Sequence, residues 1–317
     1  MRKPEFSRVT AFAPATVANV ACAFDVLGFA LHQPGDFVTV NVAEKAGILV
    51  KDISGDGGKL PREVEKNTAA VAAREVLQLA GIKDYSLEIS IKKEMPLGSG
   101  LGSSAASAVA AALAVNHLYG SPLSRTELIP AILEGERIAC GAAHADNGAP
   151  SLLGGFILIR SYQPLDIIQI KTPNELYAAV VHPQIEIRTE DARRILKRDI
   201  SMKNAIIQWG NTAGLIAGLL QIDYALIGRS LQDVIVEPER ALLIPGFDAV
   251  KKAALAHGAL GCSISGSGPS IFSLVQGERA AQSIGTAMAA EFHAIGIGAQ
   301  IFVSAINETG ATITEAS

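Results

Sequence analysis

The chain has 317 residues, of which 49% are hydrophobic and 18% are charged, so it can form one large or two modest folded domains and is not disordered. Its net charge of −4 comes from 27 basic and 31 acidic residues scattered along the chain, which excludes the strongly basic character of most nucleic-acid-binding proteins. No apolar run approaches the length of a membrane span, so no membrane association is expected.

Cysteine usage and the N-terminal residues both predict a cytoplasmic protein. The three cysteines, Cys22, Cys140 and Cys262, form no CxxC pair, which is typical of a reduced compartment and argues against a zinc site. Arg2 and Lys3 precede an apolar stretch, as in a signal peptide, but charged and polar residues interrupt the apolar core that a signal needs. We therefore expect this segment to belong to the mature protein.

Hydrophobic periodicity in the first half of the chain predicts a mixture of strands and helices. The expected elements are a strand at 38–42, a helix at 67–80, a strand at 86–92, helices at 103–119 and from 124 onwards, and a strand at 152–159. Asn67 or Thr68 caps the first helix and Gly81 ends it. Ser124 opens a capping box, and Pro130 is expected to kink or restart the helix that follows.

A polar, proline-containing segment at 161–175 is the predicted boundary between two domains, residues 1–165 and 166–317. The elements expected beyond it are a strand at 176–181, helices at 191–196, 203–221 and 247–257, strands at 260–264 and 271–275, a helix at 279–292 and a strand at 300–305. Strands and helices do not alternate strictly, which favours an α+β fold over a doubly wound sheet.

The loop from Pro96 to Ser107 is the most informative segment, because Gly98, Gly100 and Gly102 alternate with small residues between a predicted strand and a predicted helix. Such a loop can gather backbone N–H groups at the positive end of a helix dipole, which suits a phosphate. The loop matches neither a Walker A sequence nor a dinucleotide-binding G-x-G-x-x-G. The alternative is a helix that packs tightly against a sheet.

Two polar residues stand out in the apolar, small-residue segment from Pro14 to Gly28. Asn19 and Asp25 would be costly to bury there without partners, which points to a binding role. Both residue types are also common in turns, so the segment alone leaves a turn as the alternative.

Acidic, imidazole and amide side chains concentrate between Glu134 and Pro150. A carboxylate such as Glu136 near bound phosphates would suit Mg²⁺. The alternatives are an exposed helix face for this carboxylate, a turn at Asp146 and Asn147, and a structural role for His144. The spacing of a zinc site is missing.

A second glycine-rich loop at 261–270 lies between two predicted strands. Its glycines could let the backbone approach a ligand closely, and a wide hairpin loop is the alternative. The interpretation as a binding site rests on all these segments occurring together and in order.

Taken together, these segments resemble the GHMP kinase superfamily and, within it, the homoserine kinase family. Residues 14–28, 96–107 and 261–270 match the superfamily's N-terminal, phosphate-loop and C-terminal motifs in order and spacing. Other segments are more similar to homoserine kinases than to mevalonate-type members: 144–150 with 154–156, 189–193, and 237–240 with 245–246. The first motif departs from many relatives, because Ala21 and Ala23 replace a glycine and a proline.

The resemblance implies a two-lobed fold, with an N-terminal ribosomal-S5-like domain and a C-terminal ferredoxin-like domain. It also implies that the glycine loop wraps the phosphates of ATP and that Asn67 lies near the adenine nucleoside. The residues implied for the phosphate loop are Pro96, Leu97, Gly98, Ser99, Gly100, Leu101, Gly102, Ser103, Ser104, Ala105 and Ala106. Glu136 matches the carboxylate that coordinates Mg²⁺, with Ser104 as a second ligand.

The activity implied by the resemblance is ATP-dependent phosphorylation of L-homoserine to O-phospho-L-homoserine, a step of threonine biosynthesis. The residues that match the homoserine pocket are Asn19, Asp25, His144, Asn147, Thr189, Arg193 and Arg240. Asn19 and Asp25 are the expected partners of the ammonium group. The two arginines are the expected partners of the carboxylate, since their forked donors suit planar anions.

Asn147 is expected to orient the acceptor hydroxyl, with the proton passing directly to the phosphoryl oxygen, because an amide is a poor base. Asp146 is the alternative, since mevalonate-type relatives use an aspartate near this position as base. Two other functions stay open: another small-molecule kinase or decarboxylase of the mevalonate type, and a nucleotide-binding regulator without catalysis. The expected partners are small molecules, without nucleic acid or membrane, and the resemblance is consistent with a homodimer.

Overall fold

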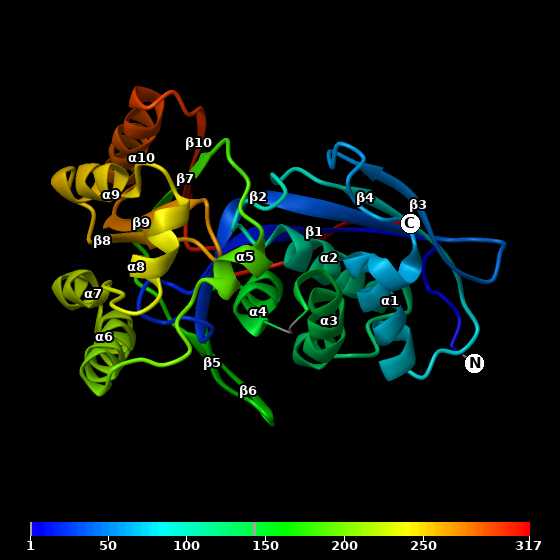
Figure 1. The fold of residues 1–317 in the computed structure, drawn as a ribbon. Coiled ribbons are helices and arrows are strands. Elements are labelled where there is room, and N and C mark those ends of the chain that lie inside the picture. Colours follow the sequence, from blue (N-terminus) through cyan, green and yellow to red (C-terminus); the bar gives the residue numbers. More distant parts are fainter. Residues whose placement is uncertain (1, 142–143) are drawn as a thin grey trace.

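The computed structural model describes residues 2–141 and 144–317, which form two β-sheets with helices packed against them (Figure 1). The strands of the larger sheet are β1 (Arg8–Ala18), β2 (Leu27–Val42), β3 (Gly47–Ser54), β4 (Ser86–Lys92), β5 (Phe156–Tyr162), β6 (Leu165–Ile170) and β11 (Thr312–Ala316). Their order is β11-β1-β2-β4-β3, and β5 pairs with both β2 and β6. Apart from the parallel pair of β3 and β4, the pairs described in this sheet are antiparallel.

Four helices cover one face of this sheet (Figure 1): α1 (Thr68–Leu79), α2 (Ser103–Leu118), α3 (Arg125–Cys140) and α4 (Ala145–Leu153). A short 3₁₀ turn, Val64–Lys66, precedes α1. Helix α2 lies between the sheet and its neighbours and is buried almost all round. Its alanine-rich sequence explains this position, because a helix that is apolar on every side belongs in a core.

The smaller sheet is antiparallel and has the order β10-β7-β9-β8. Its strands are β7 (Leu176–Pro183), β8 (Gly261–Ile264), β9 (Ile271–Gln276) and β10 (Ala299–Ala305). The helices of this half are α5 (Thr189–Arg194), α6 (Met202–Gln221), α7 (Tyr224–Ser230), α8 (Glu237–Arg240), α9 (Phe247–Ala256) and α10 (Glu278–Ala294), with a 3₁₀ turn at Ala241–Leu243. Among the helices described, none combines the length and the apolarity needed to cross a membrane.

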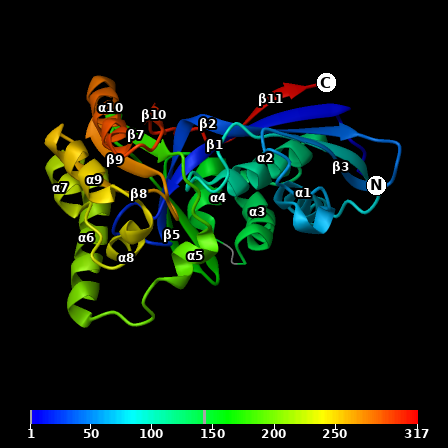
Figure 2. The ribbon, with the colours of Figure 1, turned by 45° about the horizontal axis from the view of Figure 1, so that its top comes forward.

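Strand β7 joins the two hydrophobic cores of the molecule. Its residues alternate, so that Ala178 and Val180 belong to the larger core while Ala179 and Val181 belong to the smaller one. This is the period of two expected for a strand that is covered on both faces. The chain also returns to its beginning, because β11 pairs with β1 at the edge of the larger sheet (Figure 2).

A buried ion pair fixes both ends of the glycine loop that connects β4 to α2. Asp36 on β2 is completely buried, and its carboxylate accepts hydrogen bonds from the backbone N–H groups of Glu94 (2.9 Å) and Met95 (3.2 Å) before the loop. It also pairs with Lys93, whose ammonium group donates to the carbonyl of Ser103 at 2.7 Å after the loop. The pair therefore holds the two ends of the loop at a fixed separation.

The structure confirms the α+β class and most of the expected elements, and it corrects the beginning of one strand and excludes one of the two effects expected of Pro130. The strand expected at 152–159 is wrong in its first part, because α4 continues to Leu153. Gly154 and Gly155 then turn the chain with φ of +78° and +72°, so that β5 begins only at Phe156. Helix α3 passes through Pro130 without a restart, since one missing backbone hydrogen bond near its beginning does not end a well-capped helix.

Several elements had no clear signal in the sequence, among them β1, β3, β6, β11 and the short helices α7 and α8. The second half of β1 is buried on both faces, so it lacks the alternation that marks a strand. The expected boundary after residue 165 falls within β6, and both β6 and β11 belong to the larger sheet.

Replacing Lys93 with Met should lower the free energy of unfolding by about 3–5 kcal/mol, because it leaves the Asp36 carboxylate buried without its charge partner. Denaturant unfolding measures this loss. The Lys51→Met variant is the control, because Lys51 pairs with Glu88 at an exposed site and should lose less than about 1 kcal/mol. Equal losses in the two variants would contradict the role assigned to the buried pair. Adding Asp36→Asn to Lys93→Met should restore part of the stability.

Candidate active site

A cavity of about 420 Å³ lies where the glycine loop meets α3, α4, α5 and the loop that follows β8. Residues from the N-terminal motif, the glycine loop, the acidic segment and the C-terminal motif all line it. They include most of the residues expected from the sequence: Asn19, Asp25, Asn67, Leu97, Gly98, Ser99, Gly100, Gly102, Ser103, Ser104, Glu136, His144, Asp146, Asn147, Thr189, Arg193 and Arg240. Pro96, Leu101, Ala105 and Ala106 do not line the cavity.

The glycine loop is held in place by the other two glycine-containing motifs. The backbone N–H of Thr16 donates to the carbonyl of Leu101 at 3.0 Å, and the hydroxyl of Ser265 donates to the carbonyl of Gly100 at 2.7 Å. Gly100 has φ of +77°, and a Cβ added there would lie 2.4 Å from the carbonyl oxygen of Ser265. Only glycine fits this contact, so three distant segments of the sequence meet at the loop.

The beginning of α2 offers backbone donors to the cavity. The residue before the helix is Gly102, with φ of +70°, and no side chain caps the first N–H groups. A helix of 16 residues leaves these groups unsatisfied at the positive end of its dipole, where an anion is stabilised. The loop can therefore hold a phosphate.

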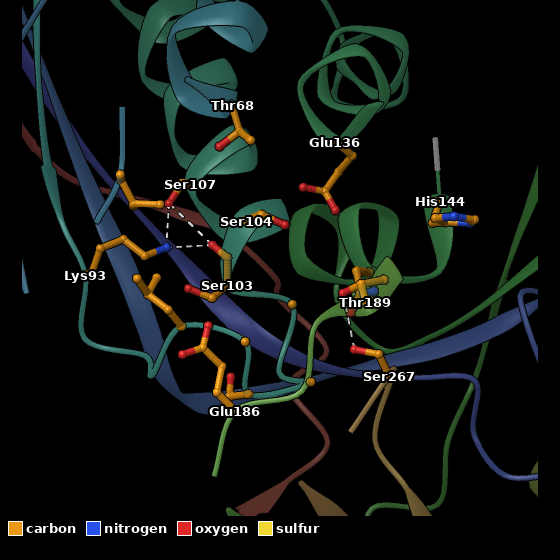
Figure 3. A pocket seen from close by; sticks show the side chains of 18 of the residues that line it. Thr68, Lys93, Ser103, Ser104, Ser107, Glu136, His144, Glu186, Thr189 and Ser267 are labelled. Atoms are coloured by element: carbon orange, nitrogen blue, oxygen red, sulfur yellow. Dashed lines mark hydrogen bonds between the residues drawn. The ribbon is translucent and has the colours of Figure 1, made fainter. Parts of the chain in front are cut away.

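Glu136 points from α3 towards Ser104 at the beginning of α2 (Figure 3). Its side chain is buried, and Oε1 has no hydrogen-bond partner among the described residues. Burial raises the pKa of this carboxyl to about 7, although Ser104 and the charge of Lys93 both lower it. A buried carboxylate oxygen without a partner, next to a hydroxyl and an anion-binding helix terminus, fits a divalent cation that also contacts phosphate oxygens.

Asp146 and Asn147 occupy the first turn of α4 and differ in their surroundings. Asp146 is buried, its Oδ1 has no described partner, and burial followed by the charge of Asp25 raises its pKa to about 7. Asn147 is half-buried, and its Oδ1 accepts a hydrogen bond from the hydroxyl of Thr16 at 2.7 Å. This bond orients the amide so that its NH₂ group is the part left for a ligand.

A cluster of charged groups lies at the end of the cavity near α5. Arg193 donates to the carboxylate of Asp25 at 2.7 Å and lies 3.3 Å from Nδ1 of His144. The guanidinium groups of Arg193 and Arg240 both stack on the ring of Phe24, 5.4 Å and 5.0 Å from its centroid. Burial and the neighbouring Arg193 lower the pKa of Arg240 to about 10 and also lower the pKa of His144.

Asn19 and Asn67 use their side chains within the protein. Asn19 donates to the carbonyl of Gly266 at 2.7 Å and accepts from the backbone N–H of Asp25 at 3.0 Å. Asn67 caps α1 by accepting from Ala70. Each residue therefore shapes the wall of the cavity. For Asn19 the two sequence alternatives, a turn and a place in the site, are both found.

Sequence reasoning missed several residues of the site. Phe24 supports the two arginines, and the hydroxyl of Tyr162 joins the N–H of Ala145 (3.2 Å) to the carbonyl of Asp25 (3.1 Å). Ser267 lies 3.3 Å from the hydroxyl of Thr189, across the cavity from Glu136 (Figure 3). An aromatic residue beside Asp25 was the available signal for Phe24, whereas nothing in the sequence pointed to Tyr162.

Lys59 and Glu186 also line the cavity and form an exposed ion pair of 3.2 Å. They come from the loop after β3 and the loop after β7, so they join the two halves of the molecule beside the site. Lys59 and Glu186 are far apart in the sequence, so no local pattern predicts that they form an ion pair.

The distribution of unsatisfied polar atoms identifies this cavity as a ligand site. Six buried side-chain atoms have no hydrogen-bond partner within residues 2–141 and 144–317. Five of them belong to residues that line the cavity: Ser99, Glu136, His144, Asp146 and Arg193. Buried polar groups without partners are costly and rare, so five around one cavity indicate bound polar ligands.

Known proteins place this site in a family. Models of the GHMP kinases N terminal domain and of the GHMP kinases C terminal domain match residues 67–155 and 215–294. A homoserine kinase from Chloroherpeton thalassium is 54% identical over 91% of this chain and 93% of its own length. One from Chlorobaculum tepidum is 50% identical over 96% of this chain and 98% of its own.

Solved structures agree with these matches. The crystal structure of homoserine kinase from Cytophaga hutchinsonii has a TM-score of 0.96 and 53% identity, with 98% of each chain covered. L. major mevalonate kinase shares the fold, with a TM-score of 0.73 at 17% identity, covering 96% of this chain and 99% of its own. The chain therefore belongs to the GHMP kinases, which confirms the expected fold. Within that class, its relatives place it in the homoserine kinase family.

Replacing Glu136 with Gln should change how stability depends on pH. The pKa of Glu136 is raised from 4.5 to about 7, so the folded protein holds this proton more tightly than the unfolded chain. The free energy of unfolding of the wild type should therefore fall as pH rises from 4.5 to 7, by on the order of 3 kcal/mol from this group. Unfolding between pH 4 and pH 8 should show Glu136→Gln gaining stability over the wild type across this interval.

The exposed Glu44 provides the control, since Glu44→Gln should track the wild type at every pH. A difference between Glu136→Gln and the wild type that stays constant over this interval would show that the carboxyl is ionised throughout.

Proposed function

We propose that this protein transfers the terminal phosphoryl group of ATP to the side-chain hydroxyl of L-homoserine, giving O-phospho-L-homoserine for threonine biosynthesis. The observation that carries the proposal is the single cavity in which an uncapped helix N-terminus, a buried carboxylate and a paired Asp25 and Arg193 lie together. Each feature suits one part of the reaction: the phosphates, a divalent cation and a zwitterionic acceptor. The chain's membership of the GHMP kinases and its similarity to homoserine kinases support the same reaction.

The glycine loop would bind the phosphates of ATP through the free N–H groups at the beginning of α2. Glu136, with the Ser104 hydroxyl beside it, would hold Mg²⁺, which would neutralise charge on the phosphate oxygens. Residues of the loop before α1 line the same cavity, including Pro61 and Asn67, and we assign the nucleoside to this side.

The zwitterion of homoserine would bind at the charged end of the cavity. Asp25 is a partner for its ammonium group, and Arg193 and Arg240 are partners for its carboxylate. One ligand atom each from Asp25, His144 and Asp146 lies within 4.8 Å of the others, a grouping that could also hold a metal ion. We favour the ammonium here, because the guanidinium of Arg193 lies 2.7 Å from Asp25 and would repel a doubly charged metal ion more strongly than a singly charged ammonium group. Thr189 and His144 complete the pocket.

Asn147 would donate from its NH₂ group to the acceptor oxygen and hold it in line with the phosphoryl group. Positioning and charge stabilisation can supply most of the acceleration when the transition state is loose, so the proton can pass directly to a phosphoryl oxygen. Asp146 is the second candidate for the proton, because a carboxyl with a pKa of about 7 suits a general base.

An ADP-release assay with a panel of acceptor alcohols tests the proposed reaction. We expect turnover with L-homoserine in the presence of Mg²⁺, and no acceptor-dependent turnover with mevalonate or without the cation. Turnover with mevalonate or its phosphates would assign the chain to a mevalonate-type activity. ATP binding without release of ADP in the presence of any acceptor would instead indicate a regulator.

Two variants distinguish Asn147 from Asp146. Asn147→Ala should lower kcat by roughly 100-fold or more, because it removes the group that positions the acceptor. Asp146→Asn should keep kcat within about tenfold of the wild type and leave the pH profile near pH 7 unchanged. Circular dichroism of both variants establishes that they fold. Loss of turnover in folded Asp146→Asn, with activity retained in Asn147→Ala, would assign the proton to Asp146.

We also propose that the enzyme works in the cytoplasm, where ATP is formed. Two of its cysteines, Cys22 and Cys262, are buried free thiols, as expected in a reducing compartment. The side chain of Cys140 lies outside what the structure describes. A homodimer is the proposed assembly.

A further inference from the structure

The loop from Asn19 to Asp25 has an unfavourable backbone conformation. Six described residues other than glycine have a positive φ, and four of them lie in this loop: Asn19 (+71°), Val20 (+26°), Ala21 (+55°) and Asp25 (+61°). Residues with a Cβ rarely adopt this conformation, and they keep it only where the surrounding structure holds them. The contacts that hold the loop therefore decide where the Asp25 carboxylate lies.

Gln208 on α6 holds the middle of this loop. Its side chain is buried, and Nε2 donates to the carbonyl of Cys22 at 2.9 Å. The hydroxyl of Thr212 also lies 2.9 Å from this carbonyl, but it lies equally close to the carbonyl of Gln208 and has only one proton to donate. Gln208 is therefore the main donor to Cys22.

The same amide group also contacts a second segment of the chain. Nε2 of Gln208 donates to the carboxylate of Asp233 at 2.8 Å, and Oε1 accepts from the backbone N–H of Val234 at 3.1 Å. A backbone N–H requires an acceptor, so the contact with Val234 fixes which end of the amide is the oxygen. Both N–H groups of Gln208 are thus used within the protein, and neither is left for a ligand.

Asp233 fixes the beginning of α8, the short helix that ends at Arg240. Its carboxylate accepts hydrogen bonds from the backbone N–H groups of Ile235 (2.9 Å), Val236 (3.0 Å) and Glu237 (2.9 Å). Helix α8 is only about one turn long, so the anchor at its beginning also determines where Arg240 lies. Helices α6 and α8 lie side by side in both views (Figures 1 and 2).

The loop and Arg240 also meet directly at the cavity. The carbonyl of Gly266 accepts hydrogen bonds from both Asn19 (2.7 Å) and Arg240 (2.9 Å), and the guanidinium of Arg240 stacks on Phe24. Gln208 does not line the cavity, so it connects the same two segments from outside it. Contacts on two sides therefore fix the position of the loop relative to α8.

We propose that Gln208 is a positioning residue for binding of the acceptor. It places Asp25 through the carbonyl of Cys22, three residues earlier in the chain. It places Arg240 through Asp233 and the beginning of α8. This inference rests on the proposed function, in which Asp25 holds the ammonium group of homoserine and Arg240 holds its carboxylate. Gln208 thereby sets the distance between the two charges that the acceptor must match.

Steady-state kinetics of Gln208→Met test this inference, because methionine has a similar volume and lacks both donors. We expect the KM for L-homoserine to rise by about tenfold or more, while the KM for ATP stays within about twofold and kcat falls by less than about threefold. A residue that only stabilises the fold would lower the amount of active protein, so kcat would fall and both KM values would stay unchanged. That result, or an equal rise in both KM values, would overturn the proposal.

Asp233→Asn weakens the same link from its other end and serves as the second variant if Gln208→Met does not fold. An amide replaces one acceptor oxygen with a donor, so it cannot accept from Gln208 and from all three backbone N–H groups. The KM for L-homoserine should again rise, by about fivefold or more, with the KM for ATP within about twofold. An unchanged KM for L-homoserine in the folded variant would contradict the role given to α8.

Two further variants are controls. Thr212→Val removes the hydroxyl beside the Cys22 carbonyl but keeps the link to Asp233, so the KM for L-homoserine should stay within about threefold. Asn116→Leu removes another buried amide, which makes two hydrogen bonds to the backbone of Leu123 at the far end of α2. It should lower stability and leave both KM values within about twofold. A rise in either control as large as in Gln208→Met would overturn the proposal.

Amide hydrogen exchange of the free protein tests the link without any acceptor. Gln208→Met should speed exchange by about fivefold or more in two segments, residues 22–27 and 234–237, whereas Thr212→Val should do so only in the first. Unchanged exchange in either segment of Gln208→Met would overturn the link. A wild type without turnover of L-homoserine would instead contradict the proposed function and the role in acceptor binding, but not the link that exchange measures.

Discussion

The whole site depends on one buried carboxylate, that of Asp36, which holds together the two ends of the glycine loop. A loop rich in glycine has many conformations, and ordering it costs conformational entropy. Hydrogen bonds from Glu94 and Met95 fix its entrance, and Lys93 connects the same carboxylate to the first turn of α2. Since breaking such a pair leaves an uncompensated charge in the core, the loop and the core are stable or unstable together.

The cavity concentrates polar atoms that the folded protein leaves without partners. Burial raises the pKa of Glu136 and of Asp146 to about 7, so the ionised form of each carboxyl is disfavoured in the protein without ligand. Such groups destabilise the free protein, and in the proposed reaction they would gain their partners when nucleotide, cation and acceptor bind. Function and stability are therefore opposed at these positions, as is common in active sites.

Much of this organisation could be predicted from the sequence, because its signals are local. Capping residues and periodicity gave α1, α3 and most strands of the second half, and the motif resemblance brought Glu136, Asn147 and Arg193 to one site. What could not be predicted depends on contacts between distant segments. Strand β11 pairs with β1 across nearly the whole chain, and Tyr162 reaches the site only through tertiary packing.

The ion pair between Asp25 and Arg193 has a consequence for discrimination among alcohols. In the free protein the two charges neutralise each other, at 27% and 31% side-chain exposure. An acceptor that separates them must offer a positive group to Asp25 and a negative group to Arg193 at the right spacing. Otherwise one of these half-buried charges is left without a partner. Neutral sugars and simple hydroxy acids cannot do so, and their binding would break the ion pair without replacing both partners. The ammonium and carboxylate groups of an amino acid replace both, so its binding would cost little.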